Sequence, residues 1–277
     1  MIIGIDFGIT NTDIVAYKEN NYEFFSIKSE KLNTNFLEKI FDFINIDINE
    51  VEKIAITGGK SSDLCDLYNN VPVIKVNEVK AIGCGAKNLY EIEEASYVAI
   101  SAGTGTACVA CNDNVFSHLG GISVGGGTLL GLSNLITNIN SADKLNKMAL
   151  EGNRKNLDAL IGEVVNDIGS LYPDITASNF VKSVDNTSHS NEDVLASLSN
   201  MIGEVIGTIS YLNALLMNVD RVYFVGRVTL LESVKKGIDK RLSLANISGI
   251  YKENREFGNA LGAIAYANKN NKFFYEI

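Results

Sequence analysis

The stretch SYVAISAGTGTACVACNDNVFSHLGGISVGGGTLLGL, from Ser96 to Leu132, carries two clusters of glycine about twenty residues apart. Its pattern predicts a strand, a tight turn at Gly103 to Gly105, a second strand over 106–111, and a glycine run that opens a helix. Glycine lets backbone amides approach an anion without a Cβ in the way, and Thr104 and Thr128 add short hydroxyl donors. One cluster alone is typical of an ordinary hairpin turn, but two in one stretch favour a site that binds phosphate.

The second cluster lies where the predicted helix begins. A helix that starts at Thr128 leaves the amides of Gly126, Gly127 and Thr128 without partners inside the helix. Such amides and the helix dipole together favour a phosphate group in front of the helix. We therefore expect these three amides to point at a bound anion.

The composition limits the class of protein. The chain has 277 residues, 46% of them apolar and 21% charged, as in a globular protein with two domains or one large α/β unit split by a cleft. Its net charge of −9 argues against nucleic-acid or anionic-membrane partners, because a polyanion needs a basic face. The start MIIGIDFG has no signal-peptide pattern, and no apolar run approaches the roughly 18 residues of a membrane span. We therefore expect a cytosolic protein.

The spacing of Cys108 and Cys111 matches a CxxC motif. On a loop or helix that motif binds metal or does redox chemistry, but here it lies in a predicted strand, where residues three apart face opposite sides. The pattern therefore indicates two buried strand cysteines.

Two acidic residues follow predicted strands. Asp6 ends the first strand of a hairpin over 1–18, beside the turn at 8–11, and either binds a hydrated Mg²⁺ ion or caps its own turn. Glu78 follows the strand over 71–76, at the edge where ligands collect in open α/β sheets. It is a candidate general base, with a solvated surface carboxylate as the alternative.

The hairpin plan occurs twice, as GIDFGITNTDIVAY near the N-terminus and as AISAGTGTACVAC in the opening stretch. Such a repeat predicts two related α/β halves around a cleft that holds a nucleotide, with subdomains over 1–95 and 96–277. Further strands are predicted over 22–28, 53–59 and 221–226, and helices over 35–45, 129–137, 141–151, 157–168, 177–184, 191–217, 230–242 and 258–268. The second half is thus rich in helices, and the last helix is expected to pack back toward the first half.

These motifs, in this order, resemble type II pantothenate kinase, of the acetate and sugar kinase, Hsp70 and actin superfamily. The motifs are GIDFGIT (4–10), TGG (57–59), the Glu78 segment, SAGTGT (101–106), LGGISVGGGT (119–128) and GNALGA (258–263). The segments over 143–164 and 177–180 also resemble that family. The implied fold is a duplicated actin-like, ribonuclease H-like core with a helical insertion in the second half.

The resemblance implies transfer of phosphate from ATP, with Mg²⁺, to the primary hydroxyl of pantothenate, the first step of coenzyme A synthesis. By motif match, Glu78 is the base, Asp6 is the acid near Mg²⁺ and the γ-phosphate, and Ser101 and His118 lie on the acceptor side. The residues matched to nucleotide binding are Asp6, Gly8, Thr10, Gly103, Thr104, Gly105, Gly125, Gly126, Gly127 and Thr128. The expected partners are pantothenate or a related small molecule, coenzyme A or an acyl-CoA as a candidate inhibitor, and a second copy in a homodimer.

Three positions depart from the family pattern. The first loop reads Gly8-Ile9-Thr10 and then Asp13, where the family has Gly-Gly-Thr and a Lys. His118 stands where the family has an Arg, and a neutral imidazole does not match the bidentate grip of a guanidinium on a carboxylate. Other cations, such as Arg154 or Arg227, are alternative partners for a substrate carboxylate.

The departures leave other functions open. His118 motivates a kinase for another hydroxylated acid or sugar, and the altered first loop motivates a non-catalytic sensor of nucleotide or acyl-CoA. An ATPase that activates a redox enzyme through an iron–sulfur cluster is also known in the superfamily, but the strand placement of Cys108 and Cys111 argues against it.

Overall fold

Two β-sheets form the framework of the chain, and the computed structural model describes residues 1–59, 61–166, 172–185 and 189–270. The first sheet contains, in spatial order, β3 (Asn21–Lys28), β2 (Asn11–Lys18), β1 (Ile2–Phe7), β4 (Lys53–Thr57), β6 (Val71–Lys75) and β5 (Leu67–Tyr68). The second contains β13 (Ser248–Ile250), β12 (Arg221–Val225), β7 (Ser96–Ala102), β8 (Thr106–Asn112) and β9 (Val115–Ile122). The strand β9 lies outside the predicted strands.

The predicted duplication is confirmed by the pairing of the strands. In the first sheet, β1 pairs antiparallel with β2 and parallel with β4. In the second sheet, β7 pairs antiparallel with β8 and parallel with β12. In each half, therefore, the central strand and the strand that follows it form a hairpin. The short turn of each hairpin lies at the carboxyl end of its central strand.

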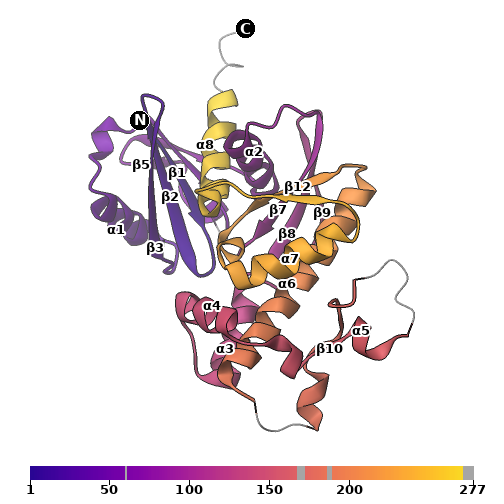
Figure 1. Cartoon of the computed structure of the whole chain (residues 1–277). Coiled ribbons are helices and arrows are strands. Elements are labelled where there is room, and N and C mark those ends of the chain that lie inside the picture. The colour runs from indigo at the N-terminus through magenta and orange to yellow at the C-terminus, as the bar shows by residue number, and fades with distance from the viewer. Residues whose placement is uncertain (60, 167–171, 186–188, 271–277) are drawn as a thin grey trace.

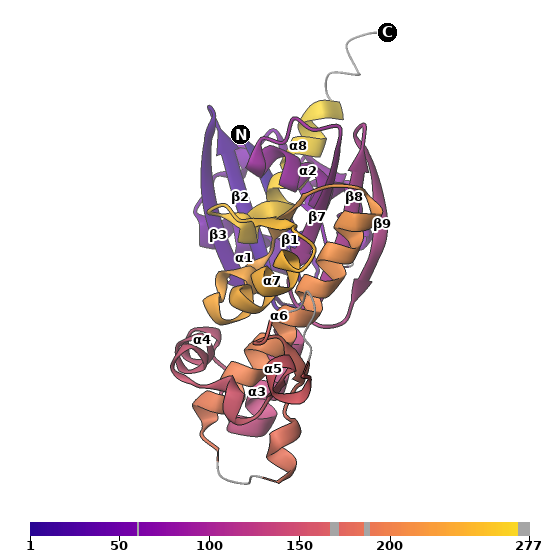
Figure 2. The same cartoon turned by 45° about the vertical axis from the view of Figure 1, so that its right-hand side comes forward.

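Two helices, α2 (Glu78–Tyr90) and α8 (Gly258–Asn270), lie between the sheets (Figures 1 and 2). The helix α8 packs on β1 and β4, the helix α2 packs on β7, β8 and β12, and the two helices pack on each other. Their crossing is lined by glycine, since a Cβ on Gly85 would lie 2.0 Å from the carbonyl oxygen of Gly258. The last helix thus packs on the first sheet.

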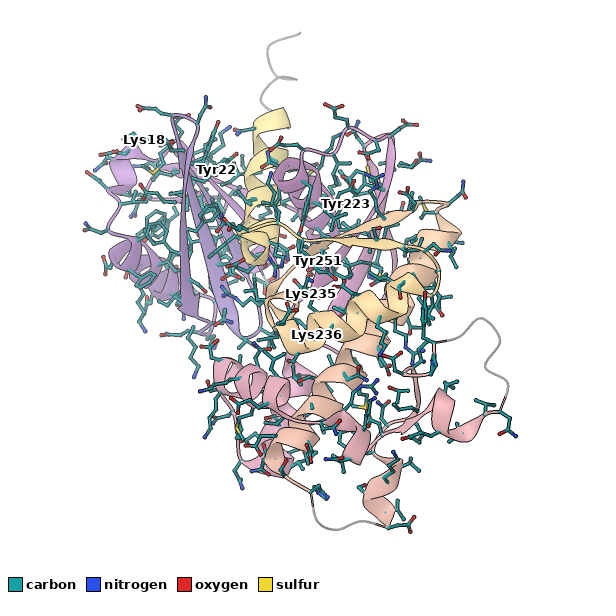
Figure 3. The ribbon with its side chains drawn as sticks, in the orientation of Figure 1. Lys18, Tyr22, Tyr223, Lys235, Lys236 and Tyr251 are labelled. Carbon is teal, nitrogen blue, oxygen red and sulfur yellow. The ribbon has the colours of Figure 1, made fainter. Side chains whose placement is uncertain are left out.

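The outer faces of the sheets are covered by other helices (Figure 1). The amphipathic helix α1 (Thr34–Ile44) begins at the cap Asn33 and buries Phe36, Ile40 and Phe41 in the core of the first sheet. The helices α6 (Asn191–Leu216) and α7 (Glu232–Ser243) share the core of the second sheet. The end of β13 is fixed on α7 where the Lys235 ammonium lies 4.8 Å from the ring centroid of Tyr251 (Figure 3).

The insertion between β9 and β12 is only partly as predicted. The helices α3 (Gly126–Thr137), α4 (Ala142–Glu151) and α6 confirm the predictions for those segments. The predicted helices over 157–168 and 177–184 are wrong in the described part, which has β10 (Ala159–Leu160), α5 (Ile161–Val164), β11 (Thr176–Ser178) and a 3-10 turn at Val181–Val184. Positions 167 and 168 lie outside the described residues.

A buried polar network explains this difference. The Asp158 carboxylate, fully buried, accepts hydrogen bonds from the Phe180 amide (3.0 Å) and the Ser197 hydroxyl. Arg154 donates to the Thr176 hydroxyl at 2.8 Å and to the backbone carbonyl of Asp174. Because these bonds hold the backbone in extended and turn conformations, the apolar residues here do not continue as helices.

The two cysteines of the CxxC motif face opposite sides of the second sheet. Cys108 packs in the core under α6, and Cys111 packs in the core under α2, both buried. Burial raises the pKa of the Cys108 thiol to about 11, so this thiol is not a reactive thiolate. The prediction of two buried strand cysteines is confirmed. In the described part of the chain, no helix is both long and apolar enough to cross a membrane.

Candidate functional site

Two pockets meet where the turns of the two hairpins face each other. They share a floor and wall formed by Asp6, Gly8, Ser101, Gly103, Thr104 and Asn259. Pocket A extends from this junction toward the helical insertion and is walled by Leu129, Leu130, Ala142, Val228 and Leu231. Pocket B extends the other way, between the first residues of α2 and the edge strand β9, and is lined by Ile9, Gly58, Gly59, Glu78, His118 and Ile122.

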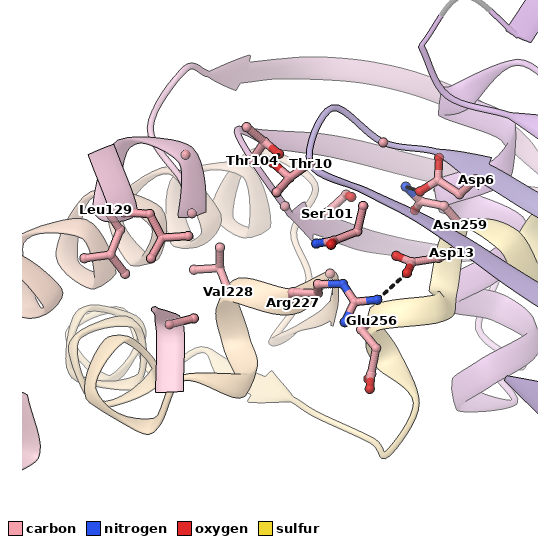
Figure 4. Close-up of a pocket in the computed structure, with 18 of the residues that line it drawn as sticks. Asp6, Thr10, Asp13, Ser101, Thr104, Leu129, Arg227, Val228, Glu256 and Asn259 are labelled. Carbon is pink, nitrogen blue, oxygen red and sulfur yellow. Dashed lines mark hydrogen bonds and ion pairs between the residues drawn. The ribbon is translucent and has the colours of Figure 1, made fainter. Parts of the chain in front are cut away.

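The two hairpin turns are in contact at the junction. The hydroxyl oxygens of Thr10 and Thr104 lie 3.1 Å apart, one from each sheet (Figure 4). The Gly103 amide donates to the Gly105 carbonyl at 2.9 Å, which closes the second turn. In the first turn, a Cβ on Gly8 would lie 2.6 Å from the carbonyl oxygen of Asn11, so only glycine fits there. Both predicted phosphate turns thus lie on the same junction.

The glycine run at the start of α3 contacts the other glycine turn. The Gly126 amide donates to the Gly103 carbonyl at 2.8 Å, and the Gly127 amide donates to the Thr104 carbonyl at 3.0 Å. These two amides are therefore occupied, and for Gly126 and Gly127 the expectation that the amide points at an anion is wrong. The helix α3 also begins at Gly126, two residues before the predicted start.

Gly125 and Thr128, on either side of Gly126 and Gly127, also lie against backbone carbonyls. A Cβ on Gly125 would lie 2.8 Å from the carbonyl oxygens of both Gly103 and Thr104, and the Thr128 hydroxyl donates to the Ser123 carbonyl. Gly126 and Gly127 line pocket A, whereas Gly125 and Thr128 line neither pocket. The run therefore holds the 103–105 turn against α3, and glycine is needed because the two backbones are in contact.

Asp6 lies at the junction, held from the far end of the chain. Its carboxylate accepts a hydrogen bond from the Asn259 side-chain amide, 3.1 Å away and 253 residues later in the sequence (Figure 4). Burial, and then the nearby Asp13 carboxylate, raise the pKa of Asp6 to about 7. A carboxylate held this way gains from a cation, so the arrangement favours a role in ligand binding over a cap on its own turn.

Replacing Asp6 with Asn is expected to stabilise the metal-free, nucleotide-free protein at alkaline pH. The Asp6 pKa is raised from 3.8 to about 7, so the stability that protonation of this residue contributes is lost as pH rises through 7. At about pH 8 the variant should gain on the order of 2 kcal/mol, or about 4–8 °C in Tm, and the gain should vanish toward pH 4. Thermal denaturation with a metal chelator measures this, and an equal gain at both pH values would contradict the assigned cause.

Glu78 and His118 come together in pocket B. Glu78 is the first residue of α2, and the preceding residue, Asn77, caps the helix because its side chain accepts a hydrogen bond from the Val79 amide at 3.0 Å. Its carboxylate is exposed to the pocket, as is His118 on β9. Arg154, an alternative partner for a substrate carboxylate, lies instead in the buried network with Asp158 and lines neither pocket.

The sequence did not reveal an ion pair that crosses pocket A. Arg227 follows β12 in the second sheet, and its guanidinium pairs with Asp13 on β2 of the first sheet (Figure 4). The charge of Asp13 in the first loop is therefore balanced within the protein. Its place in the sequence could have indicated a site residue, because Arg227 comes just after a parallel strand that ends in glycine. Such strand ends carry ligand-binding residues in α/β proteins.

Comparison with known proteins agrees with this geometry. The type II pantothenate kinase of Bacillus cereus (strain G9842) is 31% identical over 275 residues, which cover 96% of this chain and 98% of that protein. The chain belongs to the type II pantothenate kinase family. It is therefore a kinase.

Further comparisons agree with this membership. The family described as Fumble matches residues 86–235, and the type II pantothenate kinase of Staphylococcus epidermidis is 29% identical over 95% of this chain and 99% of its own length.

Solved structures share the fold at low identity. The activator of the 2-hydroxyisocaproyl-CoA dehydratase from Clostridium difficile, with bound ADPNP, superposes with a TM-score of 0.69 at 16% identity, covering 100% of this chain and 97% of that one. A ROK family glucokinase from Streptomyces griseus, in complex with glucose and AMPPNP, has a TM-score of 0.63 at 12% identity, covering 97% and 99%. These likenesses confirm the two-part, actin-like fold predicted for the type II pantothenate kinase family.

Proposed function

We propose that this chain transfers the γ-phosphate of Mg-ATP to the primary hydroxyl of pantothenate, the first step of coenzyme A synthesis. The observation that carries the proposal is that pockets A and B meet at one acid, Asp6, between two glycine turns. A reaction that transfers phosphate from a nucleotide to a second substrate needs two adjoining pockets of this kind. Family membership supports pantothenate as the acceptor.

Pocket A suits the nucleotide. The side chains of Leu129, Leu130, Val228 and Leu231 offer an apolar wall for a base, and the two threonine-bearing turns lie where the pocket reaches the junction. The hydroxyls of Thr10 and Thr104 would bind phosphate oxygens there. Phosphoryl transfer depends mainly on positioning and on neutralising charge, so such groups suffice without covalent chemistry by the protein.

The residues at the junction fit a magnesium ion. Among the described residues, no group of three or more His, Cys, Asp or Glu side chains is placed to hold a metal. Mg²⁺ usually takes only one or two protein carboxylates and completes its shell with water and substrate phosphates. Asp6, with its raised pKa and its place beside both turns, would hold the ion, which when bound neutralises the charge of the phosphates.

Pocket B suits the acceptor, with Glu78 as the base. The Glu78 carboxylate would take the proton from the acceptor hydroxyl as its oxygen bonds to the γ-phosphorus and the bond to the leaving ADP oxygen breaks. Ser101 at the junction would position the hydroxyl, and His118 would face the far end of the acceptor. Glu78 is exposed and carries no internal ion pair that would occupy it among the described residues.

A second candidate function is a kinase for another small hydroxylated acid or sugar, which His118 favours because it lacks the fixed charge of the family's arginine. ADP release measured against pantothenate, pantetheine and a panel of sugars and hydroxy acids tests both candidates. Turnover of pantothenate supports the first candidate function. Turnover of another compound of the panel, without turnover of pantothenate, supports the second. A non-catalytic sensor would bind ATP and release no ADP with any acceptor.

Replacing His118 with Arg is expected to tighten pantothenate binding. Arginine offers a fixed positive charge and two parallel N–H donors that match the geometry of a carboxylate, which a histidine does not. KM for pantothenate should therefore be lower in the variant than in the wild type. Steady-state kinetics on both proteins measure this, and equal KM values would remove His118 from the acceptor site.

Two further features, assembly as a homodimer and inhibition by coenzyme A or an acyl-CoA, rest on the family resemblance alone. A cytoplasmic location rests on the sequence pattern alone.

A further inference from the structure

Arg227 joins the two halves of the protein inside pocket A. Its Nη2 donates to the Asp13 carboxylate and, at 2.7 Å, to the Ser26 hydroxyl. The Ser26 hydroxyl in turn donates to the same Asp13 oxygen at 2.7 Å. Asp13 and Ser26 lie on β2 and β3 of the first sheet, while Arg227 begins the 3-10 turn Arg227–Leu230 that follows β12 of the second. The guanidinium is thus fixed from across the pocket.

The backbone before Arg227 sets its direction. Gly226 has a φ of +96°, and a Cβ there would lie 2.4 Å from the carbonyl oxygen of Ala102 on the neighbouring strand. The chain therefore leaves β12 pressed against β7, and the next side chain extends over pocket A toward Asp13 (Figure 4). The ring of Phe257 lies 5.7 Å from the guanidinium carbon and supports it from one side.

The guanidinium has a donor that makes no hydrogen bond to any described residue. Arginine presents five N–H groups, and the contacts with Asp13 and Ser26 both involve Nη2. Its Nε is buried and has no hydrogen-bond partner among the described residues. A buried N–H without a partner is costly, so this donor favours a ligand that brings an acceptor into the pocket.

The charges around pocket A indicate what that ligand is. Among the described residues that line the pocket, Asp6, Asp13 and Glu256 are acidic and Arg227 is the only cation. The phosphate chain of a nucleotide is the strongly anionic group expected in this pocket, and an arginine fork matches phosphate oxygens in geometry and charge. Arg227 does not line pocket B, so the acceptor's carboxylate is not its partner.

We propose that Arg227 binds the phosphate chain of the nucleotide, and that Asp13 and Ser26 are positioning residues that hold its guanidinium in place. This inference rests on the proposed function, because it takes the nucleotide to lie in pocket A. It gives the anion at position 13 a role, namely to hold a cation that arrives from the other sheet.

Calorimetric titration of ATP and of adenosine into four proteins tests the proposal: wild type, R227Q, D13N and the double variant. Arg227→Gln should weaken ATP binding by about 10- to 100-fold, the size expected for charged hydrogen bonds, and should leave adenosine binding nearly unchanged. Asp13→Asn should cost little, because the Asn oxygen still accepts from Nη2. The double variant should bind ATP as weakly as R227Q. Lys236→Gln, which removes an exposed positive charge on α7, should have no effect.

Two results would overturn the proposal. The first is recovery of wild-type ATP affinity in the double variant, which would trace the loss to the unpaired Asp13 carboxylate repelling phosphate. The second is an equal loss for ATP and adenosine, which would mean that Arg227 shapes the pocket for the nucleoside. Wild-type protein that binds no ATP would overturn the proposed function as well, whereas ATP binding without turnover of pantothenate contradicts only the proposed acceptor.

Discussion

Replacing Glu78 with Gln is expected to lower turnover of the best acceptor by about 10²- to 10⁴-fold, the contribution of a positioned general base. Glutamine keeps the size of the side chain and its place at the first position of α2, but it cannot take a proton. ATP affinity should stay nearly unchanged, because Glu78 lines pocket B and not pocket A. Steady-state kinetics and a separate titration with ATP measure the two effects.

A matched control separates this loss from an effect on the helix. Glu232 is the first residue of α7, as Glu78 is of α2, and it is also exposed and lines neither pocket. Glu232→Gln removes the same favourable interaction with a helix N-terminus, worth about 0.3–1 kcal/mol, and should leave turnover unchanged. Turnover near the wild-type level in the Glu78 variant would mean that Glu78 is only a solvated surface residue.

Replacing Gly262 with Val is expected to destabilise the protein by about 3 kcal/mol or more, because added side-chain atoms in a closely packed contact force the backbones apart. A Cβ at Gly262 would lie 1.8 Å from the carbonyl oxygen of Ala81 and 2.6 Å from the Gly85 amide nitrogen, both in α2. The expected fall in Tm is about 6–12 °C for a chain of this size. Thermal denaturation measures the change.

The same variant should also lose activity more than stability alone explains. The crossing of α2 and α8 sets the distance between Glu78, at the start of α2, and Asn259, which holds Asp6 from the start of α8. Gly131→Val in α3 is the control, because nothing lies within 4 Å of a Cβ there and valine is a better helix former than glycine. If both variants melt at the wild-type temperature, the α2–α8 contact is looser than the structure has it.

Local sequence was enough to predict the repeated part of the fold. The hairpins β1–β2 and β7–β8 follow from apolar runs that flank glycine turns, and both runs carry the same order of residues. The amphipathic helix α1 and the long helix α6 follow from their own periodicity and caps. Once the two hairpins are recognised as a repeat, the cleft between them and the facing of Thr10 and Thr104 follow as well.

The segment over 157–184 does not adopt the structure that its local pattern predicts. Its apolar spacing predicted helices, but Asp158 and Arg154 find partners in Thr176, Phe180 and Ser197, which lie up to 39 residues away. A buried carboxylate without such partners is very costly, so the network overrides a weak helical preference. Local propensity does not contain that information.

The sequence by itself determined the family, the duplicated hairpins and the two acids near the carboxyl ends of strands, because each depends on residues close together in the chain. Only the tertiary structure decided which donors remain for a ligand. The Gly126 amide is used by Gly103, while Nε of Arg227 has no partner among the described residues although its Nη2 is held by Asp13, 214 residues away. A hydrogen-bonding group is free or occupied according to what packs beside it, and packing is set by the whole fold.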